Sequence, residues 1–322
     1  MQPIAIDAMG GDKAPGEIIA GARAAAVEGI PVVLVGPTGL DGMDDLALIE
    51  AHEVIGMTDD PASSVRRKKD STLVRAAEAV RDGLASAMVS AGNTGATMGS
   101  ALLRMGRISG VARPAIATPI PRPLAGGATV LLDAGANAEV QPEWLVQFAQ
   151  MGSVYATARF GIETPRVGLL SIGEEPGKGD TLRKEAHRLL SAAPGIDFIG
   201  NIEGRDLMTD AADVVVCDGY TGNVALKTLE GGMKTLVTAL FGVFGATEET
   251  KAAAEVLVPH LLPLYGALDP NNTGGALLLG VDGVCIISHG SSNETAIINA
   301  IRVAAEAVEH DLVGHLRTAV GK

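Results

Sequence analysis

Short apolar segments alternate with longer amphipathic segments along almost the whole chain. Several of the short segments have no polar face, which is typical of strands that helices cover on both sides. An apolar core composed mainly of Ala, Val, Leu and Ile, with glycine at many turns, fits the same architecture. The pattern predicts nine strands, at Pro3–Ile6, Pro31–Val35, Ala87–Ser90, Ala115–Thr118, Thr129–Leu132, Val167–Ser171, Asp197–Ile199, Val214–Cys217 and Val284–Ile287.

The longer segments between these strands carry apolar residues at helical spacing. Such β-α alternation predicts a three-layer α/β/α sandwich around a mostly parallel sheet. No linker or change of composition divides the chain, so we expect one α/β catalytic domain over residues 1–322. The predicted helices include Pro15–Val27, Thr72–Asp82, Thr94–Leu103, Pro142–Ala158 and Glu294–Glu309.

One segment departs from this alternation. Between Leu226 and Leu264 two helices follow each other without a strand, and the first carries an apolar stripe with Phe241 and Phe244 near its end. Such a helical hairpin packs on the core or on a dimer partner in one interpretation. In the other, its tip contacts a membrane or a lipid-bearing partner through Phe241 and Phe244. The sequence leaves both interpretations open.

The charge and the cysteines exclude several classes of protein. The 322 residues include 25 Lys and Arg against 38 Asp and Glu, a net charge of −13, which argues against a nucleic-acid-binding protein. No signal sequence and no apolar run of membrane-spanning length is present, so we expect a cytoplasmic protein. Cys217 and Cys285 end apolar strands, which favours small buried residues over nucleophiles.

Turns rich in glycine, asparagine and aspartate follow six of the predicted strands. In a parallel sheet such turns meet at the carboxyl edge, where α/β folds bind ligands. Glycine lets the backbone approach a ligand closely, and helix N-termini offer N–H groups to an anion. We therefore expect one shared active-site edge that binds an anionic substrate, formed by residues 7–12, 90–95, 133–137, 173–179, 218–223 and 289–293.

Motifs for other chemistries are missing from the sequence. There is no Gly-x-Gly-x-x-Gly fingerprint, Gly173–Gly179 only approximates a phosphate-binding P-loop, and no serine stands in a nucleophile elbow. Phosphate is itself a nucleophile at neutral pH, so an enzyme that uses it needs positioning and charge stabilisation more than an attacking side chain. Nothing demands a metal or a cofactor, and we expect neither.

Several unusual segments, in order along the chain, closely resemble the bacterial phosphate acyltransferase family. The resemblance covers nearly the whole sequence. The segments that carry it are Ile6-Asp-Ala-Met-Gly-Gly-Asp-Lys-Ala-Pro15, Arg66-Arg-Lys-Lys69, Ser90-Ala-Gly-Asn-Thr-Gly-Ala96, Leu132-Asp-Ala-Gly-Ala-Asn137, Pro165–Leu170, Gly200-Asn-Ile-Glu-Gly-Arg-Asp206, Val216–Thr228 and His289-Gly-Ser-Ser292.

The resemblance implies an activity for phospholipid synthesis. Inorganic phosphate would attack the thioester of a long-chain acyl group on acyl carrier protein, and give acyl phosphate and free carrier. A membrane-bound glycerol-3-phosphate acyltransferase would then use the acyl phosphate. The resemblance also implies a homodimer, peripheral attachment to the inner face of the membrane, and a fold related to isocitrate and isopropylmalate dehydrogenases and to phosphotransacetylases.

Within that resemblance, site residues follow from the turns described above. Lys178 and Lys227 are expected to hold phosphate or the oxyanion, and Asp218 to orient them. His289 is a candidate for proton transfer, although a structural role for it is about equally supported. The residues expected to bind substrate are Asp7, Gly10, Gly11, Asp12, Asn93, Thr94, Gly95, Asn137, Asn201, Asn223 and Ser291.

Arg66, Arg67, Lys68 and Lys69 form the only dense basic run in this acidic chain. The run is a solvated loop in one interpretation and a docking site for the acidic carrier protein in the other.

Three alternative functions use the same predicted elements. The first is a phosphotransacetylase-like enzyme that moves acyl groups between coenzyme A and phosphate. The second is a metal-dependent dehydrogenase related by fold, which the missing nicotinamide fingerprint disfavours. The third is a non-catalytic scaffold that binds carrier protein at the membrane.

Overall fold

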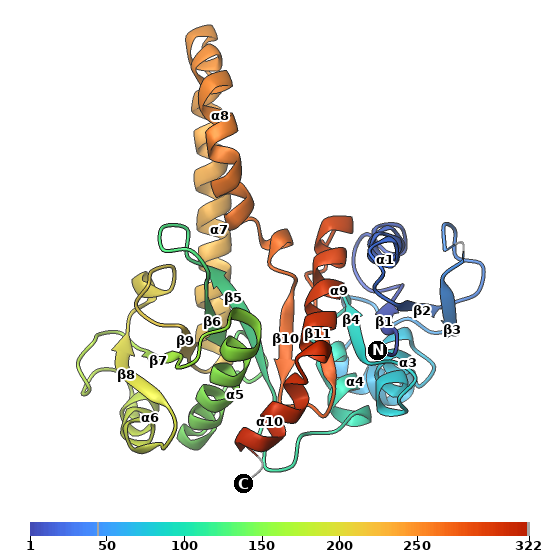
Figure 1. The fold of residues 1–322 in the computed structure, drawn as a ribbon, viewed down its shortest axis with the longest axis horizontal. Helices are drawn as coiled ribbons and strands as arrows, with labels where there is room; N and C mark the ends of the chain where they lie inside the picture. The colour runs from blue at the N-terminus through green and yellow to red at the C-terminus, as the bar shows by residue number, and fades with distance from the viewer. Residues whose placement is uncertain (44, 321–322) are drawn as a thin grey trace.

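The computed structural model describes residues 1–43 and 45–320, and within them all strands join one eleven-stranded sheet (Figure 1). The strands are β1 (Ile4–Asp7), β2 (Val32–Gly36), β3 (Ala47–Glu50), β4 (Ala87–Ser90), β5 (Ala115–Pro121), β6 (Ala128–Leu132), β7 (Arg166–Leu170), β8 (Asp197–Ile202), β9 (Val214–Val216), β10 (Ala276–Leu279) and β11 (Val284–Ile287). Their order across the sheet is β3-β2-β1-β4-β11-β10-β5-β6-β9-β7-β8. All nine predicted strands are confirmed, and β3 and β10 are additional.

The helices are α1 (Gly16–Val27), α2 (Pro61–Arg67), α3 (Thr72–Arg81), α4 (Thr94–Arg104), α5 (Pro142–Phe160), α6 (Thr181–Ala192), α7 (Gly219–Phe244), α8 (Glu248–Leu268), α9 (Glu294–Glu309) and α10 (Leu312–Val320). Two short 3₁₀ helices lie at Gly204–Asp206 and Pro270–Asn272. The predicted helices are confirmed to within two residues at each end. Side-chain caps explain several starts: Asn93, Asp218 and Asn293 each accept a hydrogen bond from a first-turn N–H of α4, α7 and α9.

The sheet consists of two half-sheets that run in opposite directions. Strands β1, β2, β3, β4 and β11 are parallel to one another, and β6, β7, β8 and β9 are parallel to one another. Between them, three antiparallel pairs, β11–β10, β10–β5 and β5–β6, reverse the direction. The prediction of a mostly parallel sheet is therefore confirmed. The prediction that all six turns share one carboxyl edge is wrong, because the two halves point in opposite directions.

The strand register nevertheless brings the carboxyl ends of both halves together. The two half-sheets are shifted relative to each other along the strand direction. A single row of paired residues across the sheet therefore passes through the carboxyl ends of strands in both halves. Turns that follow β4 and β11 therefore lie near turns that follow β6 and β9, at the point where the strand direction reverses. The row is Ile6, Val89, Ile286, Leu277, Ala117, Leu132, Val216, Leu169 and Asn201.

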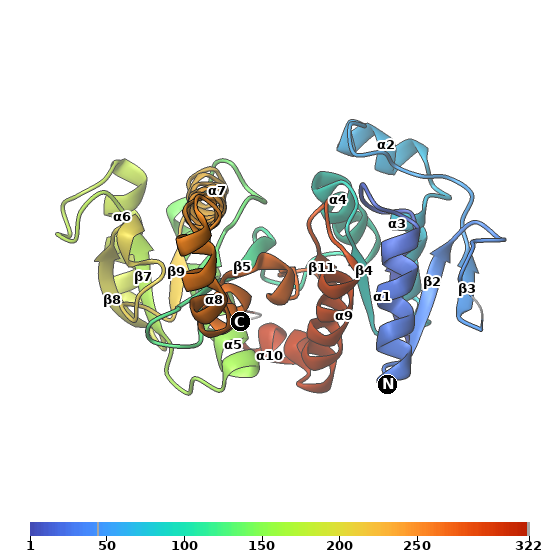
Figure 2. The same cartoon turned by 90° about the horizontal axis from the view of Figure 1, so that it is seen from above.

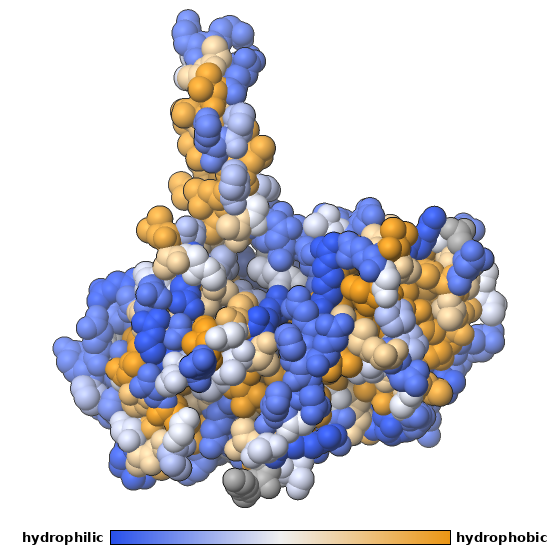
Figure 3. All heavy atoms as spheres, viewed as in Figure 1, coloured by the Kyte–Doolittle hydropathy of each residue, from blue (hydrophilic) through white to orange (hydrophobic). Residues whose placement is uncertain are grey.

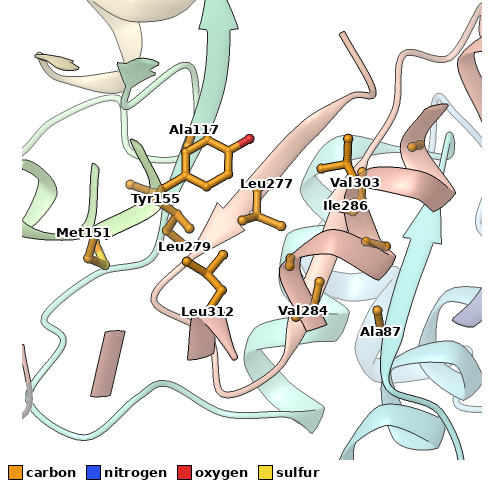
Figure 4. Packing of buried hydrophobic residues seen from close by; sticks show 14 of the residues in the cluster. Ala87, Ala117, Met151, Tyr155, Leu277, Leu279, Val284, Ile286, Val303 and Leu312 are labelled. Carbon is orange, nitrogen blue, oxygen red and sulfur yellow. The ribbon is translucent and has the colours of Figure 1, made fainter. Parts of the chain in front are cut away.

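Helices cover both faces of the sheet, which confirms the three-layer arrangement. One face packs against α1, α5, α6, α9 and α10, and the other against α3, α4 and the base of α7. At the junction of the half-sheets, Tyr155 of α5 lies beside Leu277 and Leu279 of β10, with Leu312 of α10 near them and Val303 of α9 beside Ile286 of β11 (Figure 4). Tyr155, Leu277 and Leu279 are each at most 2% exposed, so this packing fixes the two halves together.

Helices α7 and α8 form a hairpin that projects far from the rest of the molecule (Figures 1 and 2). Its bounds, Gly219–Leu268, are wider than the predicted 226–264, and α8 continues through Pro259 and Pro263. Among its described residues only Gly219, Gly222 and Ala254 are buried. Within the described chain, none of the helices is long and apolar enough to cross a membrane.

Apolar side chains remain exposed along much of the projecting hairpin below its hydrophilic end, as the orange atoms in Figure 3 show. A pair of helices alone cannot bury apolar stripes on several sides, and exposed apolar surface of this extent is typical of a contact surface. The exposed side chains are Leu236, Leu240, Phe241, Val243, Val256, Leu257, Leu262, Leu264 and Tyr265.

Candidate active site

A cleft of about 780 Å³ lies over β5 and β10, where the strand direction reverses. Helix α7 forms one wall, and the start of α4 and the turn after β11 form the other. Of the predicted site residues, Thr94, Asn223, Lys227, His289 and Ser291 line this cleft. The structure thus brings together residues from three turns that belong to both half-sheets.

Lys227 and His289 meet at the polar end of the cleft. The Lys227 ammonium lies 3.3 Å from Nε2 of His289 and 2.8 Å from Oε2 of Glu230. An ammonium group only donates hydrogen bonds, so Nε2 of His289 accepts from Lys227. On the other side of the ring, Nδ1 of His289 lies 2.9 Å from the hydroxyl oxygen of Ser291 and 3.4 Å from its backbone nitrogen. Lysine, histidine and serine thus form one connected polar chain.

Asn93 places the N-terminus of α4 at the cleft. Its side-chain oxygen accepts from the Ala96 N–H at 3.0 Å, and its amide donates to the carbonyl oxygens of Met57 and Asp59. All of its polar atoms are therefore used within the protein, and Asn93 is only 8% exposed. Thr94, the next residue, is the one that faces the cleft. Asn93 acts as a positioning residue for the helix start.

The turn after β1 supports the cleft from below rather than lining it. Asp7 is buried, and Ser90 donates to its carboxylate at 2.7 Å. Burial raises the pKa of Asp7, and the hydrogen bond from Ser90 opposes that rise. A Cβ on Gly10 would lie 2.4 Å from the Asp7 carboxylate, so only glycine fits there. The Asp12 N–H donates to the Gly290 carbonyl at 2.8 Å, which holds the turn after β11.

Asp133 organises the turn after β6. Its carboxylate accepts hydrogen bonds from the backbone N–H groups of Ile116, Gly135, Ala136 and Asn137 and from the Asn137 side chain. Burial raises the pKa of Asp133, and these hydrogen bonds oppose the rise. The carbonyl of Asn137 accepts from the Gly219 N–H at 2.7 Å, which fixes the start of α7. Asn137 is therefore a scaffold residue of the cleft wall.

Close packing also fixes α7 against this turn. A Cβ on Gly222 would lie 1.9 Å from the Asp133 carbonyl oxygen, so the helix approaches the turn at a distance that only glycine allows. Asp218 caps α7 by accepting from the Thr221 N–H, and its carboxylate pairs with Arg183, which is 13% exposed on its side chain. Asp218 is thus held by the helix and by Arg183, outside the cleft lining.

Three further predicted residues lie away from the cleft. Lys178 is exposed on the loop after β7 and is not among the residues that line the cleft. The Asn201 amide donates to the Glu175 carbonyl of that same loop at 2.9 Å. Gly95 lies against Pro61, where a Cβ would be 2.7 Å from the proline ring. The predicted substrate contacts of these three residues stay predictions.

The basic run lies on and after α2, beside the start of α4 (Figure 2). The Lys68 ammonium bonds to the Asp59 carboxylate and to the Val54 carbonyl, both at 2.7 Å. Lys68 therefore secures the preceding loop, whereas Arg66, Arg67 and Lys69 are exposed. Because Asn93 ties that loop to α4 and α2 packs against α4, the exposed basic side chains are held on the α4 side of the molecule.

Both cysteines are buried outside the cleft. Burial raises the pKa of the Cys285 thiol to about 12 and that of Cys217 well above its usual value. Neither thiol is suited to nucleophilic attack. In the described part of the chain, no three His, Cys, Asp or Glu side chains are grouped to hold a metal ion.

Sequence reasoning did not single out Glu230 and Arg183 as contributors to the site. Glu230 lies one helical turn after Lys227, and that spacing alone indicates an ion pair. Arg183 lies 35 positions from Asp218, and no local pattern relates the two residues. Tyr265 and Leu268 of α8 also line the cleft, because the hairpin returns the chain to it.

Two of the solved structures with a similar fold are, by their titles, a phosphotransacetylase and a branched-chain phosphotransacylase. The phosphotransacetylase from Streptococcus pyogenes matches with a TM-score of 0.63 at 19% identity, covering 96% of this chain and 94% of that one. The branched-chain phosphotransacylase from Enterococcus faecalis V583 matches with a TM-score of 0.63 at 17% identity, covering 96% and 100%. At these identities the likeness shows the fold alone: an α/β fold shared with phosphotransacylases.

Sequence similarity is much more specific. The family model described as "Fatty acid synthesis protein" matches residues 2–314. The phosphate acyltransferase of Desulforudis audaxviator is 48% identical over 324 residues, which cover 99% of this chain and 96% of that protein. The chain belongs to the phosphate acyltransferase family.

Proposed function

We propose that this enzyme transfers a long-chain acyl group from acyl carrier protein to inorganic phosphate, and so supplies acyl phosphate for phospholipid synthesis. The observation that supports this most directly is the Lys227–His289 pair, which lies in a cleft lined by α7, at the polar end. A cationic donor next to neutral donors suits phosphate. The apolar wall beyond them suits an acyl chain.

The reaction needs no protein nucleophile. A phosphate oxygen attacks the thioester carbonyl carbon, a C–O bond forms, and the C–S bond breaks to release the carrier thiolate. A thiol has a pKa of about 8.5, so its departure demands little protonation. The protein's task is to hold two reactants together and to stabilise the negative charge that develops on the carbonyl oxygen.

The cleft residues are suited to these two tasks. Lys227 supplies the positive charge for phosphate or the oxyanion, and Thr94 and Ser291 supply neutral hydroxyl groups nearby. Thr94 is the first residue of α4, so free backbone N–H groups of that helix face the same space. The proton for the departing thiolate would come from the Lys227 ammonium, which donates to Nε2 of His289, and His289 would orient that ammonium.

The acidic carrier protein would dock beside the cleft. The enzyme carries a net charge of −13, which repels an acidic partner at long range. Arg66, Arg67 and Lys69 are exposed next to the start of α4 and provide a local attraction that orients the carrier towards the cleft.

The hairpin is proposed to attach the enzyme to the inner face of the cytoplasmic membrane. Phe241 is 48% exposed near its tip and stacks edge-on against Phe244 with ring centres 5.9 Å apart. A second copy of the chain would cover the apolar sides of the hairpin in a homodimer. The acyl phosphate would pass to a membrane-bound glycerol-3-phosphate acyltransferase. We further propose a single catalytic domain with a fold related to isocitrate and isopropylmalate dehydrogenases.

The test is phosphate-dependent release of free thiol from palmitoyl-acyl carrier protein by the purified enzyme, with palmitoyl phosphate identified by mass spectrometry. Palmitoyl phosphate formation supports the proposal. Turnover of acetyl-coenzyme A without turnover of the carrier substrate would favour a phosphotransacetylase-like enzyme instead. Binding of the carrier without turnover of either substrate would favour a scaffold.

A further inference from the structure

Helix α7 has two adjacent glycines in its interior, Gly231 and Gly232, about halfway along the helix. Glycine is among the least favourable residues in a helix interior. Close packing does not explain either of them, since a Cβ built at each position has no atom within 4 Å. Of the two, Gly231 lines the cleft and Gly232 does not.

The cleft changes character along α7. Its lower part, at Asn223 and Lys227, is polar and contains the His289 pair. Beyond Gly231 the wall continues with Met233 and Val237, and Tyr265 and Leu268 of α8 line the same space, with Thr238 and Asp269 as polar neighbours at its edge. The cleft is therefore continuous from the reactive end to the apolar base of the projecting hairpin.

We propose that this upper, apolar part of the cleft binds the acyl chain of the substrate, and that Gly231 determines which chain lengths fit. The inference deepens the proposed function and rests on it, because the thioester carbonyl must lie at Lys227 for the chain to run upwards. From Lys227 to Val237 the helix rises about 15 Å, roughly the length of an extended chain of a dozen carbon atoms.

The missing side chain at Gly231 supports this assignment. Gly231 lines the cleft between Lys227 and Met233, and a Cβ there has no atom within 4 Å, so a larger side chain has room to extend into the cleft. It would therefore obstruct a long acyl chain while leaving the Lys227–His289 pair in place. The long side chain of Lys234 also lines this part, where its methylene groups can cover an acyl chain and its ammonium remains in water.

The adjacent glycine provides a matched control. Gly231→Phe and Gly232→Phe make the same change one residue apart, both in open space and both favourable for the helix. Each variant and the wild-type enzyme are assayed with palmitoyl- and octanoyl-acyl carrier protein. We expect Gly231→Phe to lower the ratio of kcat/KM for palmitoyl over octanoyl by about ten-fold or more, since several methylene contacts are lost. Gly232→Phe should leave the ratio unchanged.

A binding measurement separates this inference from the proposed activity. The fluorescent eighteen-carbon fatty acid cis-parinaric acid is titrated into the same three proteins, and Gly231→Phe should raise its Kd by about ten-fold. Binding that depends on Gly231 without any turnover would support the acyl-chain site in the upper cleft and would overturn the proposed function. If all three proteins turned over substrate with the same palmitoyl-to-octanoyl ratio of kcat/KM and had the same Kd, only the acyl-chain site at Gly231 would be overturned. The absence of both binding and turnover would overturn both.

Discussion

The ammonium group of Lys227 lies 3.3 Å from Nε2 of His289, although the two residues are 62 positions apart in the sequence. Lys227 belongs to the helix that follows β9, and His289 to the turn that follows β11. These strands lie in oppositely directed half-sheets. The contact therefore exists only because the offset register brings the carboxyl ends of both halves to one row.

Removing the cation tests the proposed role of this pair. Lys227→Ala should lower kcat for acyl phosphate formation at saturating phosphate by about 100-fold, the usual effect of losing one stabilising donor. Lys251→Ala is the matched control, because Lys251 makes an equivalent ion pair with Glu248 on the distant part of the hairpin. Equal activity of both variants would remove Lys227 from the mechanism. A loss with Lys178→Ala instead would bring the loop after β7 into the site.

A buried ion-pair cluster predicts acid sensitivity of the fold. Burial alone would raise the pKa of Asp213, but hydrogen bonds and charge from Arg166, with Arg122, outweigh it and hold the pKa below its usual value. A lowered pKa in the folded state means that this stabilisation is present above about pH 4 and is lost as the pH falls through the lowered value. Asp213→Asn should lower the free energy of unfolding by about 3 kcal/mol at pH 7. It should also make that free energy depend less on pH below about pH 4.

Asp210, close to Asp213 in the sequence, provides a control for the stability change caused by Asp213→Asn. Asp210 bonds to the same two arginines but is 66% exposed on its side chain. Asp210→Asn should therefore cost less than about 1 kcal/mol in urea-unfolding experiments at pH 7. If the two variants lost equal stability, the burial of Asp213 would not be what makes its ion pairs strong.

Charge reversal tests the docking surface. Arg66→Glu/Arg67→Glu should raise KM for palmitoyl-acyl carrier protein several-fold at low salt while kcat changes little, because the attraction acts before the chemical step. The difference from wild type should shrink as salt rises. Arg188→Glu on α6 serves as the control for a change of charge elsewhere. A KM that stays the same at every salt concentration would contradict carrier docking at this surface.

Polar substitution at the hairpin tip tests membrane attachment. Phe241→Ser/Phe244→Ser should reduce flotation of the protein with phosphatidylglycerol–phosphatidylcholine vesicles to near background, since it removes the aromatic pair near the tip. Leu124→Ser/Ile172→Ser removes two apolar side chains of 98% and 82% exposure from the body of the protein. Comparable loss in both double variants, or in neither, would contradict attachment through the tip.

The two thiols should be unreactive in the native enzyme. Cys217 and Cys285 are fully buried, and the pKa of Cys285 is about 12, so very little thiolate exists at pH 8. Ellman's reagent should react with neither thiol within minutes, and with both after unfolding. Acyl phosphate formation should survive treatment with iodoacetamide. Rapid inactivation by that reagent would contradict a mechanism without a cysteine nucleophile.

Periodicity predicted most of the elements because buried strands and amphipathic helices leave strong local patterns. The strand Ala87–Ser90 and the helix Glu294–Glu309 were predicted with the bounds that the structure shows. β3 was missed because its residues are half-exposed at the sheet edge, and β10 because its apolar run has no pattern that separates it from helix. The reversal of strand direction is a property of long-range pairing, which no local pattern encodes.

The same distinction applies to the site. Thr94, Asn223, Lys227, His289 and Ser291 were predicted from turn chemistry and family resemblance, and all five line the cleft. Asn93, Asn137 and Asp218 were predicted as substrate or catalytic residues, yet their side chains cap helices and hold backbone groups. The sequence shows which residues suit a polar turn, whereas only the folded structure shows whether the ligand or the backbone receives the hydrogen bond.

The most direct test of the account uses phosphate labelled with oxygen-18 at all four positions, palmitoyl-acyl carrier protein and the purified enzyme. Attack by phosphate on the thioester carbonyl places the bridging oxygen in the product, so the account predicts palmitoyl phosphate that retains all four labels, with an equal amount of free carrier thiol. Release of carrier thiol with palmitate as the only acyl product would show that water is the nucleophile, and would contradict the account.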